Sequence, residues 1–158
     1  MTPLQEAINS LSIEDVCLRS NSTKISNGFE PKYNKSDELK ISFKHLVEHA
    51  ETYEIEEPED GDSSYILRVF VELGARLKDE SSDQEHAIEI EADFVAEYSM
   101  STMLSKECID EFALKNASYH IWPYWREFLM SQCMRLGMSK IAVPTFQVAS
   151  NQKHHPQK

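Results

Sequence analysis

Apolar and charged side chains alternate with a period of two through residues 88–97, whose sequence is IEIEADFVAE. Alternation of this kind is typical of a β-strand that buries one face and exposes the other. The stretch 65–78, YILRVFVELGARLK, has the same period and directs Arg68 and Glu72 away from its apolar side. The pattern therefore predicts a chain built around a sheet with one apolar face.

Two further segments complete the predicted sheet. Residues 13–20 are predicted to form a short strand, and residues 39–43 alternate apolar side chains with Lys40 and Ser42. A polar loop over residues 21–37 separates these two strands. Short polar turns, including the acidic stretch 54–62, join the later strands, so we expect neighbouring strands to pair antiparallel.

The period changes to that of a helix after Ser105, which suits an N-cap. Arg135 and Gly137 are typical of a helix end. Pro123 lacks a backbone donor and predicts a kink or break near Tyr119–Trp122. The residues expected on the stripe that faces the sheet are Ile109, Phe112, Ala113, Ala117, His120, Ile121, Tyr124 and Phe128.

This helix carries more apolar surface than one sheet face can cover. Trp122, Trp125 and Leu129 lie off the predicted stripe, and large aromatic side chains are usually buried by packing. Another subunit is therefore favoured over a bound ligand as their partner. The predicted oligomer interface comprises Ile121, Trp122, Tyr124, Trp125, Phe128 and Leu129.

The chain has 158 residues, which fits a single domain. Residues 1–12 are interpreted as a flexible or short helical arm, residues 13–149 as the domain, and residues 150–158 as a polar disordered tail. Neither a run long enough to span a membrane nor a secretory signal is recognisable, so no membrane insertion and a cytoplasmic location are expected. Cys17, Cys108 and Cys133 are widely spaced and are expected to be small buried side chains.

The formal net charge of the chain is −11. A protein that binds nucleic acid needs a basic surface to displace counterions, so nucleic acid is not an expected partner. A strongly acidic composition keeps a protein with exposed apolar patches in solution, and it suits basic or mixed-charge polypeptides as partners.

The sequence contains no recognisable catalytic or cofactor-binding motif. It has neither a glycine-rich phosphate loop nor an HExxH helix, and no carboxylate pair stands out for acid–base work. His45 and His49 are predicted to share one face of a strand at a spacing too long for one metal ion. No catalytic residue, cofactor or metal is predicted, and the protein is expected not to be an enzyme, with an active site of scattered residues as the alternative.

The segment IWPYWREF, residues 121–128, followed by RLGMSKIAVPTF, residues 135–146, resembles the helix segment of the SecB export-chaperone family. Upstream, residues 64–77 and 87–100 resemble the third and fourth strands of that family. The similarity covers roughly residues 13–146. The matched residues of the helix segment are Pro123, Tyr124, Arg126, Glu127, Arg135, Gly137 and Pro144.

The resemblance implies an α+β fold in which a four-stranded antiparallel sheet carries one long kinked helix, and a short C-terminal helix or turn, on one face. It also implies a homotetramer, assembled as a dimer of dimers. Members of the family act without ATP as holdases, which bind unfolded polypeptides in long surface grooves. Its export members pass these clients to the SecA motor.

The resemblance also implies site residues. The groove of the family lies between the loop that joins the first two strands and the segment after the main helix, which here gives Phe29, Tyr33, Met138, Ile141, Val143 and Phe146. Glu91 matches one acid that the family offers to SecA, whereas Ser20 and Lys24 stand where two others are expected, which argues against SecA docking. The second helix of the family is truncated here after Pro144.

The sequence therefore favours an ATP-independent holdase, either for exported proteins or for a dedicated client such as an antitoxin. The alternative is a non-enzymatic adaptor of the same fold that binds one specific protein partner. The range of clients separates the two hypotheses, because an adaptor would ignore unrelated unfolded chains.

Overall fold

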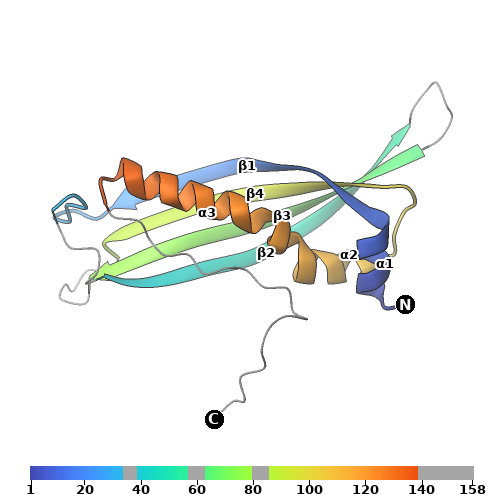
Figure 1. Cartoon of the computed structure of the whole chain (residues 1–158), viewed down its shortest axis with the longest axis horizontal. Coiled ribbons are helices and arrows are strands. Elements are labelled where there is room, and N and C mark those ends of the chain that lie inside the picture. The colour runs from blue at the N-terminus through green and yellow to red at the C-terminus, as the bar shows by residue number, and fades with distance from the viewer. Residues whose placement is uncertain (34–38, 57–62, 80–85, 139–158) are drawn as a thin grey trace, which may run out of the picture.

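The structure is a computed structural model, and it describes residues 1–33, 39–56, 63–79 and 86–138. Four long strands are followed by a helical segment that one π-helical turn divides into two helices (Figure 1). In chain order the elements are α1 (Pro3–Ser10), β1 (Leu11–Ile25), β2 (Leu39–Glu56), β3 (Ser63–Asp79), β4 (Ile88–Met100), α2 (Lys106–Phe112), the π turn (Ala113–Ala117) and α3 (Ser118–Arg135).

The strands form one antiparallel sheet in the order β1-β4-β3-β2, which confirms the predicted α+β class and the four-stranded sheet. All three helices lie on the same side of this sheet, with α1 beside α2 at one end (Figure 1). The strands are longer than predicted: β1 extends beyond residues 13–20, and β2 continues into the acidic stretch that was expected to be a turn. The predicted C-terminal helix or turn falls outside the described residues.

The sheet has two unlike faces, which we call the helix face and the open face. On the helix face, alternate residues of β3 and β4 are almost completely buried against α2 and α3. The ring of Tyr98 meets that of Phe112 at 4.9 Å, and Phe94 meets Phe128 at 6.3 Å, both edge to face. The buried positions on this face of the two strands include Leu67, Val69, Val71, Leu73, Ile88, Ile90, Ala92, Phe94, Ala96 and Tyr98.

Both predicted ends of the helical segment are confirmed. The Ser105 hydroxyl accepts a hydrogen bond from the backbone N–H of Cys108 at 3.3 Å, as an N-cap does. After α3, Gly137 adopts a φ of 74°, and the N–H of Met138 donates to the carbonyl of Cys133 at 3.1 Å. This bond and the left-handed glycine form a Schellman motif, which requires a residue that tolerates positive φ.

The π turn changes which side of the helix faces the sheet. A π turn holds one residue more than an α turn, so side chains beyond it are rotated by about 100° relative to a continuous α-helix. Ile109 and Phe112 are buried before the turn, and Trp125 and Leu129 are buried after it. Tyr124, predicted on the stripe, is instead 48% exposed. The predicted stripe is therefore right before the π turn and wrong by about one residue beyond it.

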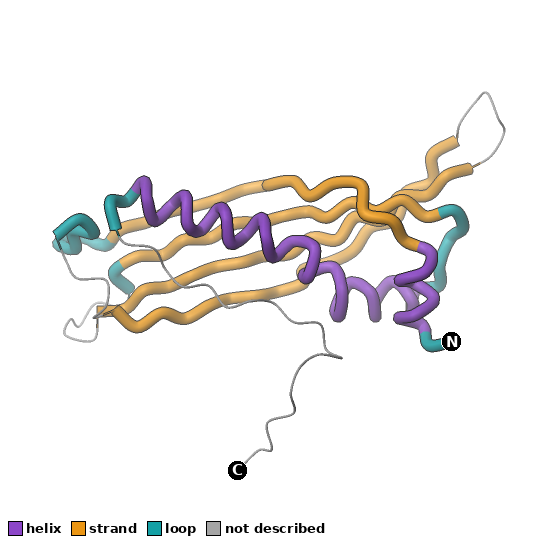
Figure 2. Tube along the Cα trace, in the orientation of Figure 1, coloured by secondary structure: helices purple, strands orange, loops and turns teal. Residues whose placement is uncertain are grey.

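Pro123 lies inside α3 and does not break it. The predicted interruption at Tyr119–Trp122 is wrong in position, because the departure from α geometry lies at the π turn, where the helical segment changes direction (Figure 2). Pro123 and Tyr119 are exposed, so the carbonyl that loses its donor lies where water can satisfy it. No helix among the described residues is long and apolar enough to cross a membrane.

Candidate functional site

One end of the molecule brings together the two segments predicted to form a groove. The loop after β1 begins at Ser26, whose N–H donates to the carbonyl of Ala87 at 3.0 Å. The loop then reaches the end of α3, where a side chain built on Gly137 would lie 3.7 Å from the Cβ of Lys32. Residues far apart in the sequence are thus neighbours here, as the predicted groove requires.

The predicted groove residues divide into three groups. Phe29 and Met138 are each only 8% exposed and belong to the core, so they support this end of the fold and are not open groove walls. Tyr33 is 79% exposed, with the Lys32 ammonium 5.6 Å from its ring centroid. Ile141, Val143 and Phe146 lie outside the described residues. Tyr33 is therefore the one predicted groove residue that is open to solvent in the described part of the chain.

The predicted oligomer interface is corrected by burial within the single chain. Ile121, Trp125 and Leu129 have no exposed surface, and Trp122 is 8% exposed, so these side chains pack against the sheet. The rotation at the π turn is the cause, because it moves Trp122, Trp125 and Leu129 from the side of the helix to the stripe that faces the sheet. Tyr124 remains half exposed and Phe128 is partly buried.

The outer side of α3 carries a different apolar set. Tyr119 and Met134 are 49% and 77% exposed, and Leu114 in the preceding π turn is 63% exposed. Near the end of α3 a shallow depression of about 340 Å³ is lined by Glu127, Met130, Ser131, Met134 and Arg135. The helical spacing of these five residues places them on one side, so they form a continuous surface that faces away from the sheet.

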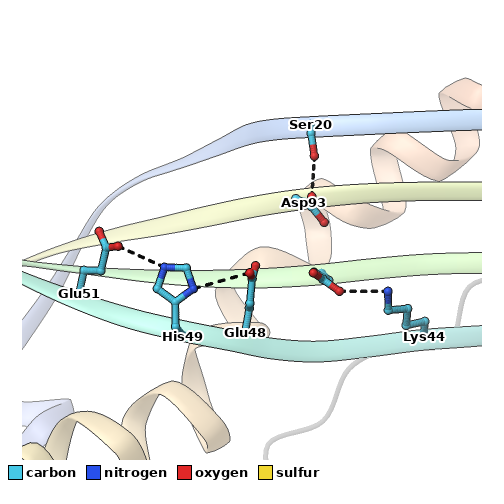
Figure 3. A network of polar contacts seen from close by, with 7 residues as sticks. Ser20, Lys44, Glu48, His49, Glu51 and Asp93 are labelled. Atoms are coloured by element: carbon cyan, nitrogen blue, oxygen red, sulfur yellow. Dashed lines mark hydrogen bonds and ion pairs between the residues drawn. The ribbon is translucent and has the colours of Figure 1, made fainter.

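The open face carries polar contacts within and between strands, of which Figure 3 shows those of Ser20, Lys44 and His49. Lys44 on β2 lies 3.0 Å from Glu72 on β3, and this hydrogen-bonded contact raises the pKa of the Lys44 ammonium. Between β3 and β4, Arg76 lies 3.3 Å from Glu89 and Arg68 lies 3.5 Å from Glu97. The positive side chains of β2 and β3 thus compensate the acids of the inner strands.

Glu91, the predicted motor-docking acid, belongs to this set of ion pairs across the open face, which we call the ion-pair ladder. Its carboxylate lies 4.0 Å from the guanidinium of Arg76, and its side chain is 35% exposed. Ser20, which stands where another acid was expected, donates a hydrogen bond to Asp93 at 2.5 Å. The open face is therefore a mixed-charge surface and not an acidic one.

A hollow of about 570 Å³ lies at the centre of the open face. Each edge strand has a bulge at this level, at Arg19 in β1 and at Glu48 in β2, and bulges redirect the side chains they carry. Phe70 lines the hollow, its ring stacked on His49 at 4.3 Å. The guanidinium groups of Arg19 and Arg68 lie 5.7 Å and 5.3 Å from the Phe70 centroid, within reach of a cation–π contact.

The same bulge corrects the prediction that His45 and His49 share a face. The extra residue reverses the alternation, so His49 lies on the open face, whereas His45 lies on the helix face 2.5 Å from the buried hydroxyl of Ser118. On α3, Nδ1 of His120 lies 2.9 Å from the hydroxyl of Tyr98. Partial burial lowers the pKa of both His45 and His120, which favours their neutral forms.

The described residues contain three free cysteines and no candidate metal site. Within the described residues, no cluster of three or more His, Cys, Asp or Glu side chains is arranged to hold a metal ion. Cys108 and Cys133 are buried as predicted, whereas Cys17 is exposed on the open face. Desolvation, together with the Asp15 carboxylate, raises the pKa of the Cys17 thiol and keeps it protonated, the less reactive form.

The arrangement of one antiparallel sheet, a long helical segment on a single face and an N-terminal helix at its end is the SecB-like fold. A solved structure that shares it is the SecB-like chaperone Rv1957 of Mycobacterium tuberculosis, in complex with a ChAD peptide from the Rv1956 HigA1 antitoxin. The alignment has a TM-score of 0.62 and covers 92% of this chain and 96% of that chain, at 13% sequence identity. The predicted resemblance is therefore confirmed at the level of the fold.

Sequence comparison, in contrast to the comparison of structures, finds no match. No protein-family model matches the chain, and no curated protein matches it. The likeness at 13% identity shows the fold alone, so the site residues are argued from the geometry above.

Proposed function

We propose that this protein is an ATP-independent holdase that binds non-native polypeptides on apolar parts of its surface. The observation that carries the proposal is the fold, which it shares over nearly its whole length with a chaperone solved with an antitoxin peptide. The chain adds exposed apolar side chains at two places where polypeptide can reach them, the outer side of α3 and the edge strands. Its net charge of −11 keeps such a surface in solution.

The predicted groove remains part of this proposal, with Tyr33 as its exposed residue and with Phe29 and Met138 as buried supports. Tyr33 is the exposed aromatic at its described end, while Phe29 and Met138 anchor the loop and the helix terminus from inside. An aromatic side chain held on a well-anchored loop buries much apolar area at a low entropy cost, which suits weak binding to many sequences.

We also propose that the protein assembles into a homo-oligomer, with a dimer of dimers as the expected form. The outer side of α3, with Tyr124 and Met134 exposed, takes the place of the buried tryptophans as one contact surface. Several copies in one assembly present several binding surfaces to a single long client, which raises avidity without any new contact.

Delivery to the SecA motor is not part of this proposal. The acids of the inner strands are compensated by Arg68, Arg76 and Lys44, so a basic partner gains little from them. A dedicated client in the cytoplasm is the form of the proposal that this surface favours. A specific adaptor for one folded partner is the second candidate, supported by the same fold.

The test is suppression of aggregation. A chemically unfolded test protein is diluted with and without the purified chain, in the absence of nucleotide, and light scattering is followed. We expect suppression that saturates at about one oligomer per client and is unaffected by added ATP. A chain that fails to suppress aggregation of several unrelated unfolded proteins, yet captures one folded partner, would establish the adaptor instead.

A further inference from the structure

The outer edge of β2 has no partner strand among the described residues, because β2 is the last strand of the sheet. Its pairing with β3 is regular from His49 to Glu56, since the bulge lies before His49. The other edge strand, β1, is interrupted by two bulges, at Glu14 and Arg19. A regular unpaired edge offers a row of backbone donors and acceptors to another extended chain, whereas a bulged edge resists pairing.

Glu54 and Glu56, at the end of this stretch, have no cationic partner among the described residues. Glu48, Glu51, Glu54 and Glu56 lie within it or beside it, and in the described structure none of them forms an ion pair with a lysine or arginine. Glu51 accepts a hydrogen bond from Tyr53, which lowers the pKa of its carboxyl, and His49 at 3.2 Å and Arg68 on the opposite strand act in the same direction. On β3 and β4, by contrast, Glu72, Glu89 and Glu97 are each ion-paired across the sheet.

From Tyr53 to Glu56, at the end of this edge, apolar and acidic side chains are separated by face. Tyr53 and Ile55, 43% and 41% exposed, lie on the open face. Glu54 and Glu56 alternate with them and lie on the opposite face, without a hydrogen bond or ion pair in the described structure. The first half of β2 is different, because it carries Lys40 and Lys44, and lysine on an edge discourages pairing.

We propose that Ala50–Glu56 of β2 accepts an extended polypeptide segment as a fifth strand of the sheet. Apolar side chains of the segment lie beside Tyr53 and Ile55 on the open face, and its lysine or arginine side chains lie beside Glu54 and Glu56 on the other. Backbone hydrogen bonds supply affinity that does not depend on sequence, and the two faces supply selectivity. The inference rests on the proposed holdase function and specifies where and how one part of a client is held.

The probe for the charge and face pattern is a short capped peptide of alternating valine and lysine, labelled with a fluorophore. Two controls accompany it: a peptide of alternating valine and glutamate, and one of the same valine–lysine composition in blocks, which mixes the faces. We expect the alternating valine–lysine peptide to bind about tenfold or more tightly than either control. Equal binding of the block peptide would overturn the proposed strand pairing.

Matched variants locate the site. Glu54→Gln with Glu56→Gln should weaken binding of the valine–lysine peptide about threefold or more at low salt, because two uncompensated charges are lost. Glu6→Gln with Glu107→Gln removes the same charge from exposed positions on α1 and α2 and should leave binding unchanged. Equal weakening by both pairs would show that only the net charge matters, which contradicts a site on β2.

Proline variants test the backbone bonds. Successive residues of a strand point their N–H groups in opposite directions, so one of Thr52→Pro and Tyr53→Pro removes a bond to β3 and the other removes a donor at the free edge. The variant that keeps the wild-type urea midpoint is the edge variant. It should bind the valine–lysine peptide about tenfold more weakly than the wild type. Unchanged affinity in that variant would refute strand addition.

Amide hydrogen exchange separates this inference from the proposed function. Added peptide should protect every second amide between Ala50 and Glu56, whereas side-chain docking gives no alternation. If the wild type suppresses aggregation while these amides stay unprotected, the strand-addition site is wrong and the holdase function stands. If the wild type neither suppresses aggregation nor binds the peptide, both are wrong.

Discussion

β3 has two faces that are stabilised by different interactions. Val69 and Val71 are at most 1% exposed on the helix face, and they gain stability because apolar surface leaves water. Between them in sequence, Phe70 lies on the open face under Arg19 and Arg68, with an ion-pair ladder beside it. The helix face thus fixes the fold, whereas the open face and the edges remain hydrated surfaces on which contacts with other chains can form.

The largest loss of stability is expected at Trp125, on the side of α3 that faces the sheet. Trp125→Ala leaves a cavity under α3 and is expected to lower the free energy of unfolding by about 3–5 kcal/mol. Its neighbour Tyr124 is 48% exposed, so Tyr124→Ala should cost much less, about 1 kcal/mol or below. Urea unfolding followed by circular dichroism measures both changes.

The two variants also decide between the interface predicted from sequence and the burial seen in the structure. If Trp125→Ala leaves stability unchanged and lowers only the oligomer mass in light scattering, the ring faces another subunit. The indole N–H of Trp125 has no hydrogen-bond partner among the described residues. Trp125→Phe should therefore cost less than Trp125→Ala, because it removes an unsatisfied donor while it keeps most of the ring volume.

On the open face, Phe70→Leu is expected to lower the free energy of unfolding by about 1 kcal/mol. The substitution keeps apolar volume but removes the stacking with His49 and the two cation–π contacts, each worth about 0.5–1 kcal/mol at exposed sites, with part regained by hydration. A matched change on the other face, Val71→Ala, should lower the free energy of unfolding by about 1.5–3 kcal/mol, because the Val71 side chain is buried away from water. An equal cost for both changes would contradict the difference between the faces.

The period-two pattern was sufficient to predict β3 and β4, because each of them buries one face and the pattern reports that directly. The edge strands β1 and β2 are largely exposed, so the pattern located them but not their full lengths. The helix boundaries were also predictable, since Ser105 and Gly137 act through local backbone geometry. The inserted residue of the π turn at Ala113–Ala117 has no comparable local signal. It appears only when the helix is fitted to the sheet, so the buried side of α3, and with it the predicted interface, was missed.

Bulges explain the corresponding error in the site. A bulge adds one residue to a strand, and the single residue Glu48 moved His49 to the face opposite His45. The proposed edge site on β2 could not be predicted either. It depends on which acidic side chains form ion pairs with a lysine or arginine of a neighbouring strand, and that requires the strand register. Composition reported the net charge but not its distribution between inner strands and the edge.

Histidines on the helix face make stability depend on pH. Burial lowers the pKa of His45 and His120 in the folded state, so the unfolded chain binds protons more readily below the ordinary histidine pKa of about 6.5. Stability should therefore be complete at about pH 7.5 and should fall as the pH is lowered through about 6.5 to 5.5. Urea midpoints at the two pH values test this, and His120→Gln should reduce the difference. A midpoint that rises on acidification would contradict it.

The smallest effect is expected from the open-face ladder. Lys44 and Glu72 are 3.0 Å apart, but their side chains are 46% and 28% exposed, so water and salt screen the attraction. Lys44→Met should change the free energy of unfolding by no more than about 1 kcal/mol, and the remaining effect should shrink in high salt. Because the same substitution leaves Glu72 uncompensated, it should strengthen binding of a lysine-containing client at low salt. A large loss of stability that persists in salt would mean that the open face also holds the fold together, and its acids would then be unavailable to any partner.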